Sequence, residues 1–168
     1  LGTLKFSGEG GASSASSIDG TAAGDIWDTF DGARGAVTAV AVSDSATGNN
    51  SVFYTLPTLM DGLSINASYK PQASSRESGT GYGVSYTGIE GLTASYATSD
   101  IVGTTAALSG DQTVWKLSYA YGPVTATASN SEYDVTTVAS DQDTSSYAIS
   151  YTVCLLYTSP SPRDSIRS

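Results

Sequence analysis

The chain has no histidine, one cysteine and only seven lysine and arginine residues among its 168 residues. Without histidine a Ser-His-Asp triad is impossible, and one cysteine cannot form an intramolecular disulfide or a cysteine-rich metal site. The net charge of −9 argues against nucleic acid as a partner, because phosphate binding requires clustered lysine and arginine. We therefore predict no enzyme activity, no metal site and no cofactor.

Long apolar runs are also missing. No stretch of about 18 apolar residues occurs, so a transmembrane helix is not predicted. A membrane-spanning β-strand carries a much weaker signal, because only every second residue has to be apolar. Disorder is not expected either, since 11 Tyr, 2 Trp and 3 Phe are present and only 14% of the residues are charged.

The two ends of the chain indicate an incomplete natural sequence. It begins at Leu1 without a charged-then-apolar leader, so we expect any signal peptide to lie upstream. Residues 154–164, CLLYTSPSPRD, match a translated transposase sequencing adapter codon by codon. We expect residues 154–168 to be non-native and exclude them from fold reasoning. Residues 1–153 are then expected to be a fragment of a longer protein.

The residues that remain show the period of two that is typical of β-strands with two different faces. Three segments alternate strictly: Leu63–Lys70, Leu92–Ser99 and Val124–Ser131. Three others share the order aromatic, small or polar, aliphatic, Ser, Tyr: Tyr82–Tyr86, Trp115–Tyr119 and Tyr147–Tyr151. These three begin 33 and 32 residues apart, which indicates a repeated hairpin unit. With Leu1–Ser7 and Ser51–Leu56, about eight strands are predicted.

The predicted connections alternate between short and long. The short ones are rich in Gly, Pro and Asp: Leu59–Gly62, Gly88–Gly91 and Gly122-Pro123. The long ones are polar and irregular: Pro71–Gly79, Ile101–Asp111 and Tyr133–Asp143. Short turns at one rim and long loops at the other are the plan of an outer-membrane barrel, with the short turns on the periplasmic side.

The alternation separates an apolar face from a hydroxyl-rich face. The apolar face consists of Leu63, Ile65, Tyr69, Tyr82, Val84, Tyr86, Leu92, Tyr96, Trp115, Leu117, Tyr119, Tyr121, Ile149 and Tyr151. No Lys, Arg, Asp or Glu falls on it within the predicted strands, which is what lipid requires, because a mid-bilayer Lys costs roughly 2–4 kcal/mol. An aromatic girdle before the short turns is predicted at Tyr54, Tyr86, Tyr119 and Tyr121.

The other face is nearly all Ser, Thr, Asn, Gly and Ala. A closed eight-stranded barrel must fill its own interior with side chains, whereas small hydroxyl residues suit the wall of a wide, water-filled lumen. The predicted strands are therefore part of a larger barrel. The alternatives are a small OmpA-like barrel or adhesin that binds partners through its loops, and a secreted soluble β-sandwich, whose strands alternate in the same way.

Three stretches in order, LGTLKFSGEGG, DIWDTFDGARG and SVFYTLPTLMDGLSINASYKP, resemble the general diffusion porins of Gram-negative bacteria, of the alphaproteobacterial type. The resemblance covers residues 1–153. It implies an all-β protein, an antiparallel transmembrane β-barrel of sixteen strands of which about eight are present here. It also implies residence in the bacterial outer membrane in contact with lipid, a homotrimer, and passive diffusion of ions and small hydrophilic solutes.

In this family a loop folds into the lumen and narrows it, and the resemblance assigns residues 8–50 to that constriction loop. The acids that would edge the constriction are Glu9, Asp19, Asp25, Asp28 and Asp31. Arg34 lies in the same loop, where a local ion pair is the alternative to a role in the pore. The candidate lumen-facing bases are Lys5, Lys70 and Lys116. Because acids outnumber bases at such a rim, mild cation preference is predicted.

Overall fold

The computed structural model describes residues 1–9, 11–18, 22, 50–71, 78–103, 109–136 and 141–152. The expected adapter-derived tail, residues 154–168, lies outside the described residues, as does most of the expected constriction loop. Among the described residues, no helix has the length and hydropathy needed to cross a membrane.

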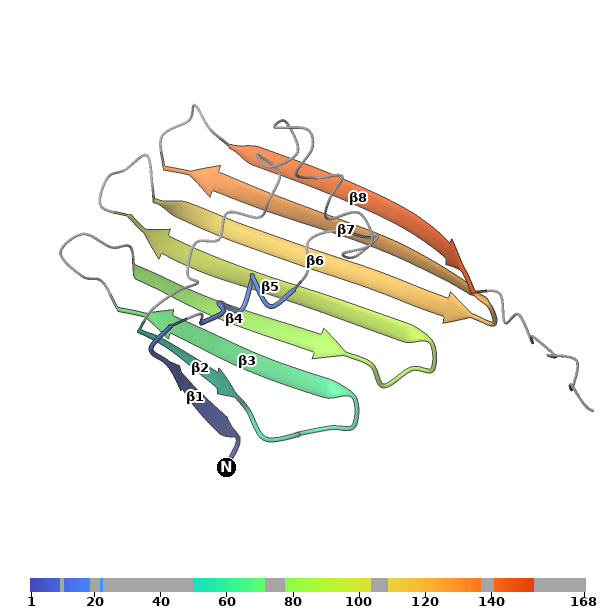
Figure 1. Cartoon of the computed structure of the whole chain (residues 1–168), viewed down its shortest axis with the longest axis horizontal. Coiled ribbons are helices and arrows are strands. Elements are labelled where there is room, and N and C mark those ends of the chain that lie inside the picture. The colour runs from blue at the N-terminus through green and yellow to red at the C-terminus, as the bar shows by residue number, and fades with distance from the viewer. Residues whose placement is uncertain are drawn as a thin grey trace, which may run out of the picture.

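Eight strands form one sheet in the order in which they occur along the chain (Figure 1). The strands are β1 (Thr3–Ser7), β2 (Ser51–Thr55), β3 (Leu63–Lys70), β4 (Ser78–Tyr86), β5 (Leu92–Val102), β6 (Gly110–Tyr121), β7 (Val124–Val135) and β8 (Gln142–Tyr151). Every neighbouring pair is antiparallel. The predicted all-β class and the predicted number of strands are therefore confirmed.

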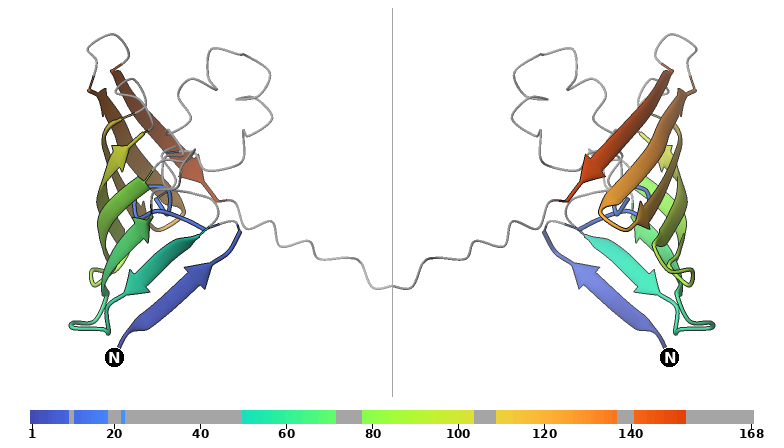
Figure 2. Two further views of the ribbon diagram at one scale, coloured as in Figure 1. Left: turned by 90° about the vertical axis from the view of Figure 1, so that its left-hand side faces the viewer. Right: turned by 90° about the vertical axis from the view of Figure 1, so that its right-hand side faces the viewer.

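The sheet is a meander, with each strand beside its sequence neighbours. A β-sandwich would divide the strands between two facing sheets, so the sandwich alternative is wrong for the described strands. Figure 2 shows that the sheet is curved, with both edge strands, β1 and β8, bending toward the same side. The curvature gives the sheet a concave and a convex face.

The strands are longer than predicted at the rim that carries the long connections. β4 begins at Ser78, β6 at Gly110 and β8 at Gln142, four or five residues before the aromatic residues expected to open them. The long connections are correspondingly shorter than expected. Pairing of the backbones continues into polar residues because the hydrogen-bond ladder does not depend on apolar side chains, which were the signal used to place the strand ends.

Candidate functional site

The convex face carries large apolar and aromatic side chains that remain exposed. In the register, Tyr96 lies opposite Trp115, and Leu117 lies opposite Ala94 and Ala128. Exposed members of this face on β4 to β8 are Tyr82, Val84, Tyr96, Val102, Trp115, Leu117, Tyr119, Tyr121, Val124, Tyr147, Ile149 and Tyr151. A continuous apolar surface of this extent marks contact with a membrane or another protein, because exposing it to water is unfavourable.

The apolar band on the convex face has a boundary at each rim. At the short-turn rim, Tyr121 lies opposite Val124, which lies opposite Tyr151. At the other rim Asp111 lies between Asp100 and Asp134 on the same face. The row of Glu132 and Asp143, which includes Thr113 of β6, lies eight residues from the row of Tyr121, about 27 Å along the strand and about 21 Å along a barrel axis at 40° tilt. This height is close to the apolar band of about 25 Å in outer-membrane barrels.

The expectation that no charged residue falls on this face is wrong for the full length of the strands. At the long-connection rim, the strands extend beyond their predicted ends. The residues in these extensions include Asp100, Asp111, Glu132, Asp134 and Asp143, all exposed and all on the convex face. Asp100, Asp111 and Asp134 form the outer row, and Glu132 and Asp143 lie one row further in, at the edge of the apolar band. They therefore mark where the nonpolar environment ends, which the shorter predicted strands could not show.

The row of three aspartates leads to a prediction about stability. Like charges directly opposite one another on neighbouring strands are destabilising. Replacing the central residue, Asp111→Asn, is expected to increase the free energy of unfolding by roughly 0.2–1 kcal/mol at low salt, and by less at 1 M salt because of screening. Urea unfolding of the membrane-inserted protein measures it. Asp61→Asn, in a short turn, is the control, and equal gains from both variants would contradict the explanation.

The concave face is hydroxyl-rich. One cross-strand row on β3 to β8 consists of Ser64, Ser85, Ser95, Lys116, Ser129 and Ser146. In the next row toward the short turns, the hydroxyls of Ser118 and Thr127 are hydrogen-bonded at 2.9 Å. Short polar side chains of this kind interact well with water and leave the space in front of the sheet open.

Residues 11–18, which we call the docked segment, lie on this concave face (Figure 2). The backbone N–H of Ser14 donates to Oγ of Ser68 on β3 at 2.9 Å, and Oγ of Ser14 donates to the same oxygen at 3.2 Å. Beyond the segment, the N–H of Ala22 donates to Oγ of Ser146 on β8 at 3.0 Å. The chain after β1 therefore contacts the concave face at both β3 and β8.

A small apolar cluster fixes the middle of the docked segment. Ala15 packs against Ala97 on β5 and Val114 on β6, all with 0% exposure, and Ile18 packs beside them. The segment itself is a compact turn, in which Ser17 N–H donates to the Ser13 carbonyl oxygen at 3.0 Å. Val114 is thus an apolar exception on the hydroxyl face, and its burial beneath the docked segment is the physical reason.

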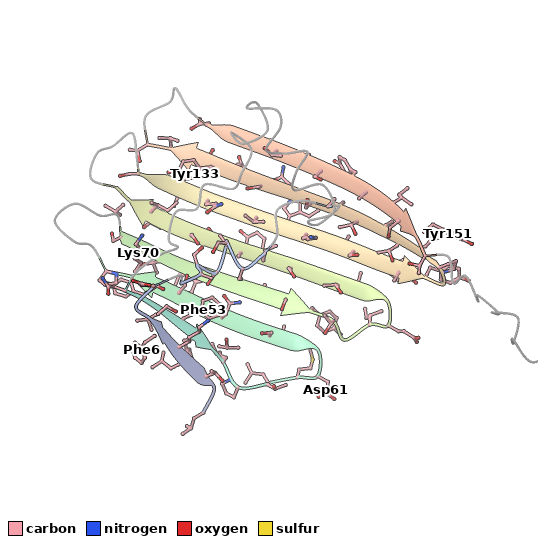
Figure 3. All side chains as sticks on the ribbon, viewed as in Figure 1. Phe6, Phe53, Asp61, Lys70, Tyr133 and Tyr151 are labelled. Atoms are coloured by element: carbon pink, nitrogen blue, oxygen red, sulfur yellow. The ribbon has the colours of Figure 1, made fainter. Side chains whose placement is uncertain are left out.

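The predicted basic residues all lie on the concave face. Lys5 is opposite Phe53, which is opposite Ser68, and Lys116 belongs to the serine row. Lys70 is 9% exposed and ends β3 near the long-connection rim. Tyr133 of β7 lies near the same rim, whereas Asp61 and Tyr151 lie at the opposite rim (Figure 3). The three lysines are thus on the face that the docked segment covers, but the register separates them.

The predicted acids of the constriction are described only in part. Glu9 follows β1 and is exposed. Asp19, Asp25, Asp28, Asp31 and Arg34 lie outside the described residues. Within the part of the chain that the structure covers, no group of three or more His, Cys, Asp or Glu side chains is arranged to hold a metal ion.

The contact between Ser14 and Ser68 is a feature that the sequence interpretation missed. A signal for it was present in β4, where glycine occupies alternate positions 79, 81 and 83. Alternate positions share one face of a strand, and glycine in a strand often marks the close approach of another backbone. Gly79, Gly81 and Gly83 are all buried, although they belong to a single sheet.

An antiparallel meander with an apolar, exposed convex face and a hydroxyl-rich concave face is the wall of a transmembrane β-barrel. Comparison with protein families identifies which one: the family model described as Gram-negative porin matches residues 2–155. The chain belongs to the Gram-negative porins and resides in the bacterial outer membrane. Membership of this family of non-enzymatic channels argues against the alternative that the chain is a small OmpA-like barrel or adhesin. No curated protein and no solved structure shows significant similarity to the chain.

Proposed function

We propose that this porin forms a water-filled pore for passive diffusion of ions and small hydrophilic solutes. The observation that carries the proposal is the opposite chemistry of the two faces of one sheet. Lipid contacts the exposed aromatic and aliphatic side chains, and water contacts the serine and threonine hydroxyls. Because side chains alternate strictly between faces, each strand separates lipid from water over the height of the apolar band.

Residues 8–50 are proposed to be the segment that narrows this pore. The segment leaves the sheet after β1 and returns at Ser51, the first residue of β2. Its described parts contact the concave face at Ser68, Val114 and Ser146, on three different strands. Contacts on β3, β6 and β8 support an inward position across the lumen rather than a position above the rim. The acids predicted within it would then act at the narrowest point.

Solute flux tests the pore. The protein reconstituted into liposomes is expected to admit small sugars, with rates that fall as sugar size increases, because a pore of this type selects by diameter. Osmotic swelling of the liposomes measures the rates. Liposomes that swell no faster with the protein than without it would contradict the proposed function.

The proposed charge at the constriction makes a separate prediction. The chain carries 16 acidic against seven basic residues, and five of the six acids in residues 8–50 are the candidates for the rim. Cations are therefore expected to pass more readily than anions of equal size. A reversal potential measured across a planar bilayer with a KCl gradient reports the preference. Removing all five acids, as Asn or Gln, is expected to abolish it, and a wild-type preference for chloride would contradict the assignment.

Assembly is proposed to be homotrimeric, in line with the family resemblance. A trimer of barrels migrates as one species in detergent without heating and as a monomer after boiling. Electrophoresis of unheated and heated samples tests this proposal, and identical migration at the monomer position in both samples would contradict it.

A further inference from the structure

Gly81 occupies a special place on the concave face. It is paired with Ser68 of β3 on one side and with Ser99 of β5 on the other. Both hydroxyls lean into the space that a side chain at position 81 would fill. A Cβ atom there would lie 2.7 Å from Oγ of Ser68, 2.6 Å from Oγ of Ser99 and 3.3 Å from Cβ of Ser14 in the docked segment. All three distances are shorter than ordinary van der Waals contact.

The two serine hydroxyls beside Gly81 differ in the hydrogen bonds that they make. Oγ of Ser99 is buried and has no hydrogen-bond partner among the described residues, so its rotation breaks no hydrogen bond there. Oγ of Ser68 accepts both hydrogen bonds from Ser14. Ser68 is 5% exposed, so its side chain is buried between the wall and the docked segment. A side chain at position 81 would therefore act on the docked segment through Ser68.

We propose that Gly81 is a positioning residue that keeps the docked segment on the pore wall, and so sets the width of the pore. The missing side chain allows the Ser68 hydroxyl to lie over β4 and to accept the two bonds from Ser14. The remaining contact, with Cβ of Ser14 at 3.3 Å, would be relieved by a shift of a few tenths of an ångström. The statement about pore width rests on the proposed function, whereas the statement about docking does not.

The test measures docking separately from conduction. Val114 lies beneath the docked segment with 0% exposure, and Val114→Cys introduces a smaller side chain that creates no steric overlap. In the membrane-inserted protein, with Cys154→Ser to remove the only other thiol, a water-soluble thiol reagent modifies this cysteine only when the segment leaves the wall. The modification rate therefore reports undocking.

Gly81→Ala and Ser68→Ala are each expected to raise the modification rate roughly tenfold, the effect of losing about one to two ordinary hydrogen bonds. Gly83→Ala is the matched control: its Cβ would press on Oδ1 of Asn66 at 2.7 Å, and its three nearest atoms all belong to Asn66 in the wall. Ser99→Ala is the second control. Both controls are expected to keep the wild-type rate. A wild-type rate in Gly81→Ala, or an equal rise in Gly83→Ala, would overturn the proposal.

The double variant Gly81→Ala with Ser68→Ala provides a second measurement. It removes one of the two hydroxyls that the new Cβ meets, so it also serves when the single glycine variant folds poorly. If Gly81 acts through Ser68, the double variant has the modification rate of Ser68→Ala alone, because the two changes remove the same contact. Effects that multiply would show an independent action of Gly81 and overturn the proposal.

Single-channel conductance then separates the two claims. We expect Gly81→Ala and Ser68→Ala to increase conductance together with the modification rate, whereas the two controls leave both unchanged. Faster modification at unchanged conductance would support the docking role of Gly81 while overturning both its role in pore width and the proposed constriction. An increase in conductance without faster modification would overturn the docking role.

Discussion

Leu117→Lys is expected to lower the free energy of unfolding from a bilayer by roughly 2–4 kcal/mol, the cost of lysine on the lipid face near the midplane. Leu117 lies on the convex face of β6, between the acids of one rim and the aromatic side chains of the other, and is 45% exposed. Lysine at this position would place its ammonium group in hydrocarbon or force it to stretch toward an interface. Urea titration of folding into lipid vesicles measures the change.

The matched control places the same side chain at nearly the same depth on the opposite face. Thr93 is the neighbour of Ala94, the residue directly opposite Leu117, and it is exposed on the concave side. Thr93→Lys is expected to change stability by less than about 1 kcal/mol, because the ammonium group remains in water. Equal losses in the two variants would show that the assignment of lipid to the convex face is wrong.

Gly91→Ala is expected to destabilise the folded barrel wall by about 2–5 kcal/mol, through backbone strain together with steric overlap. Gly91 has a φ of +76° in the short turn before β5, a conformation that L-residues adopt at a cost. A Cβ there would overlap the carbonyl oxygen of Ala120 on β6. The overlap would push β6 away from β5 where Ala120 N–H donates to the Gly91 carbonyl oxygen at 2.7 Å.

A variant at Gly122 measures the effect of backbone strain without steric overlap. Its φ of +57° is also positive, but a Cβ there meets nothing within 4 Å. Gly122→Ala is therefore expected to cost only the strain, about 1–2 kcal/mol. Urea unfolding midpoints of both variants test the difference, and a larger loss for Gly122→Ala than for Gly91→Ala would contradict the explanation.

Much of the wall could be predicted because alternation is a local property. Leu63–Lys70 was predicted with its observed bounds, since a turn with Gly62 precedes it and a proline follows it. The faces of Leu117 and Lys116 followed from the parity of their positions alone. The strand ends at the long-connection rim did not follow, because Asp111 and Glu132 interrupt the apolar pattern while the backbone pairing continues.

The candidate site was less accessible to such reasoning. Residues 8–50 were assigned to an inward loop from a resemblance, and the acids expected at the constriction beyond Glu9 lie outside the described residues. The contact of Ser14 with Ser68 joins residues that are 54 positions apart in a serine-rich chain. No periodicity distinguishes Ser68 from the other serines of the same face, so the pairing could not be read from the pattern.

The order of residues was enough to establish which side chains share a face, because a β-strand places every second residue on the same side whatever surrounds it. It was also enough to locate the tight turns, since glycine and proline act within a few residues. The fold was needed to show that the chain after β1 returns to the concave face, and that Gly81 leaves room for it there. That contact depends on strands distant in sequence, whose distance of approach is set by the curvature of the whole sheet.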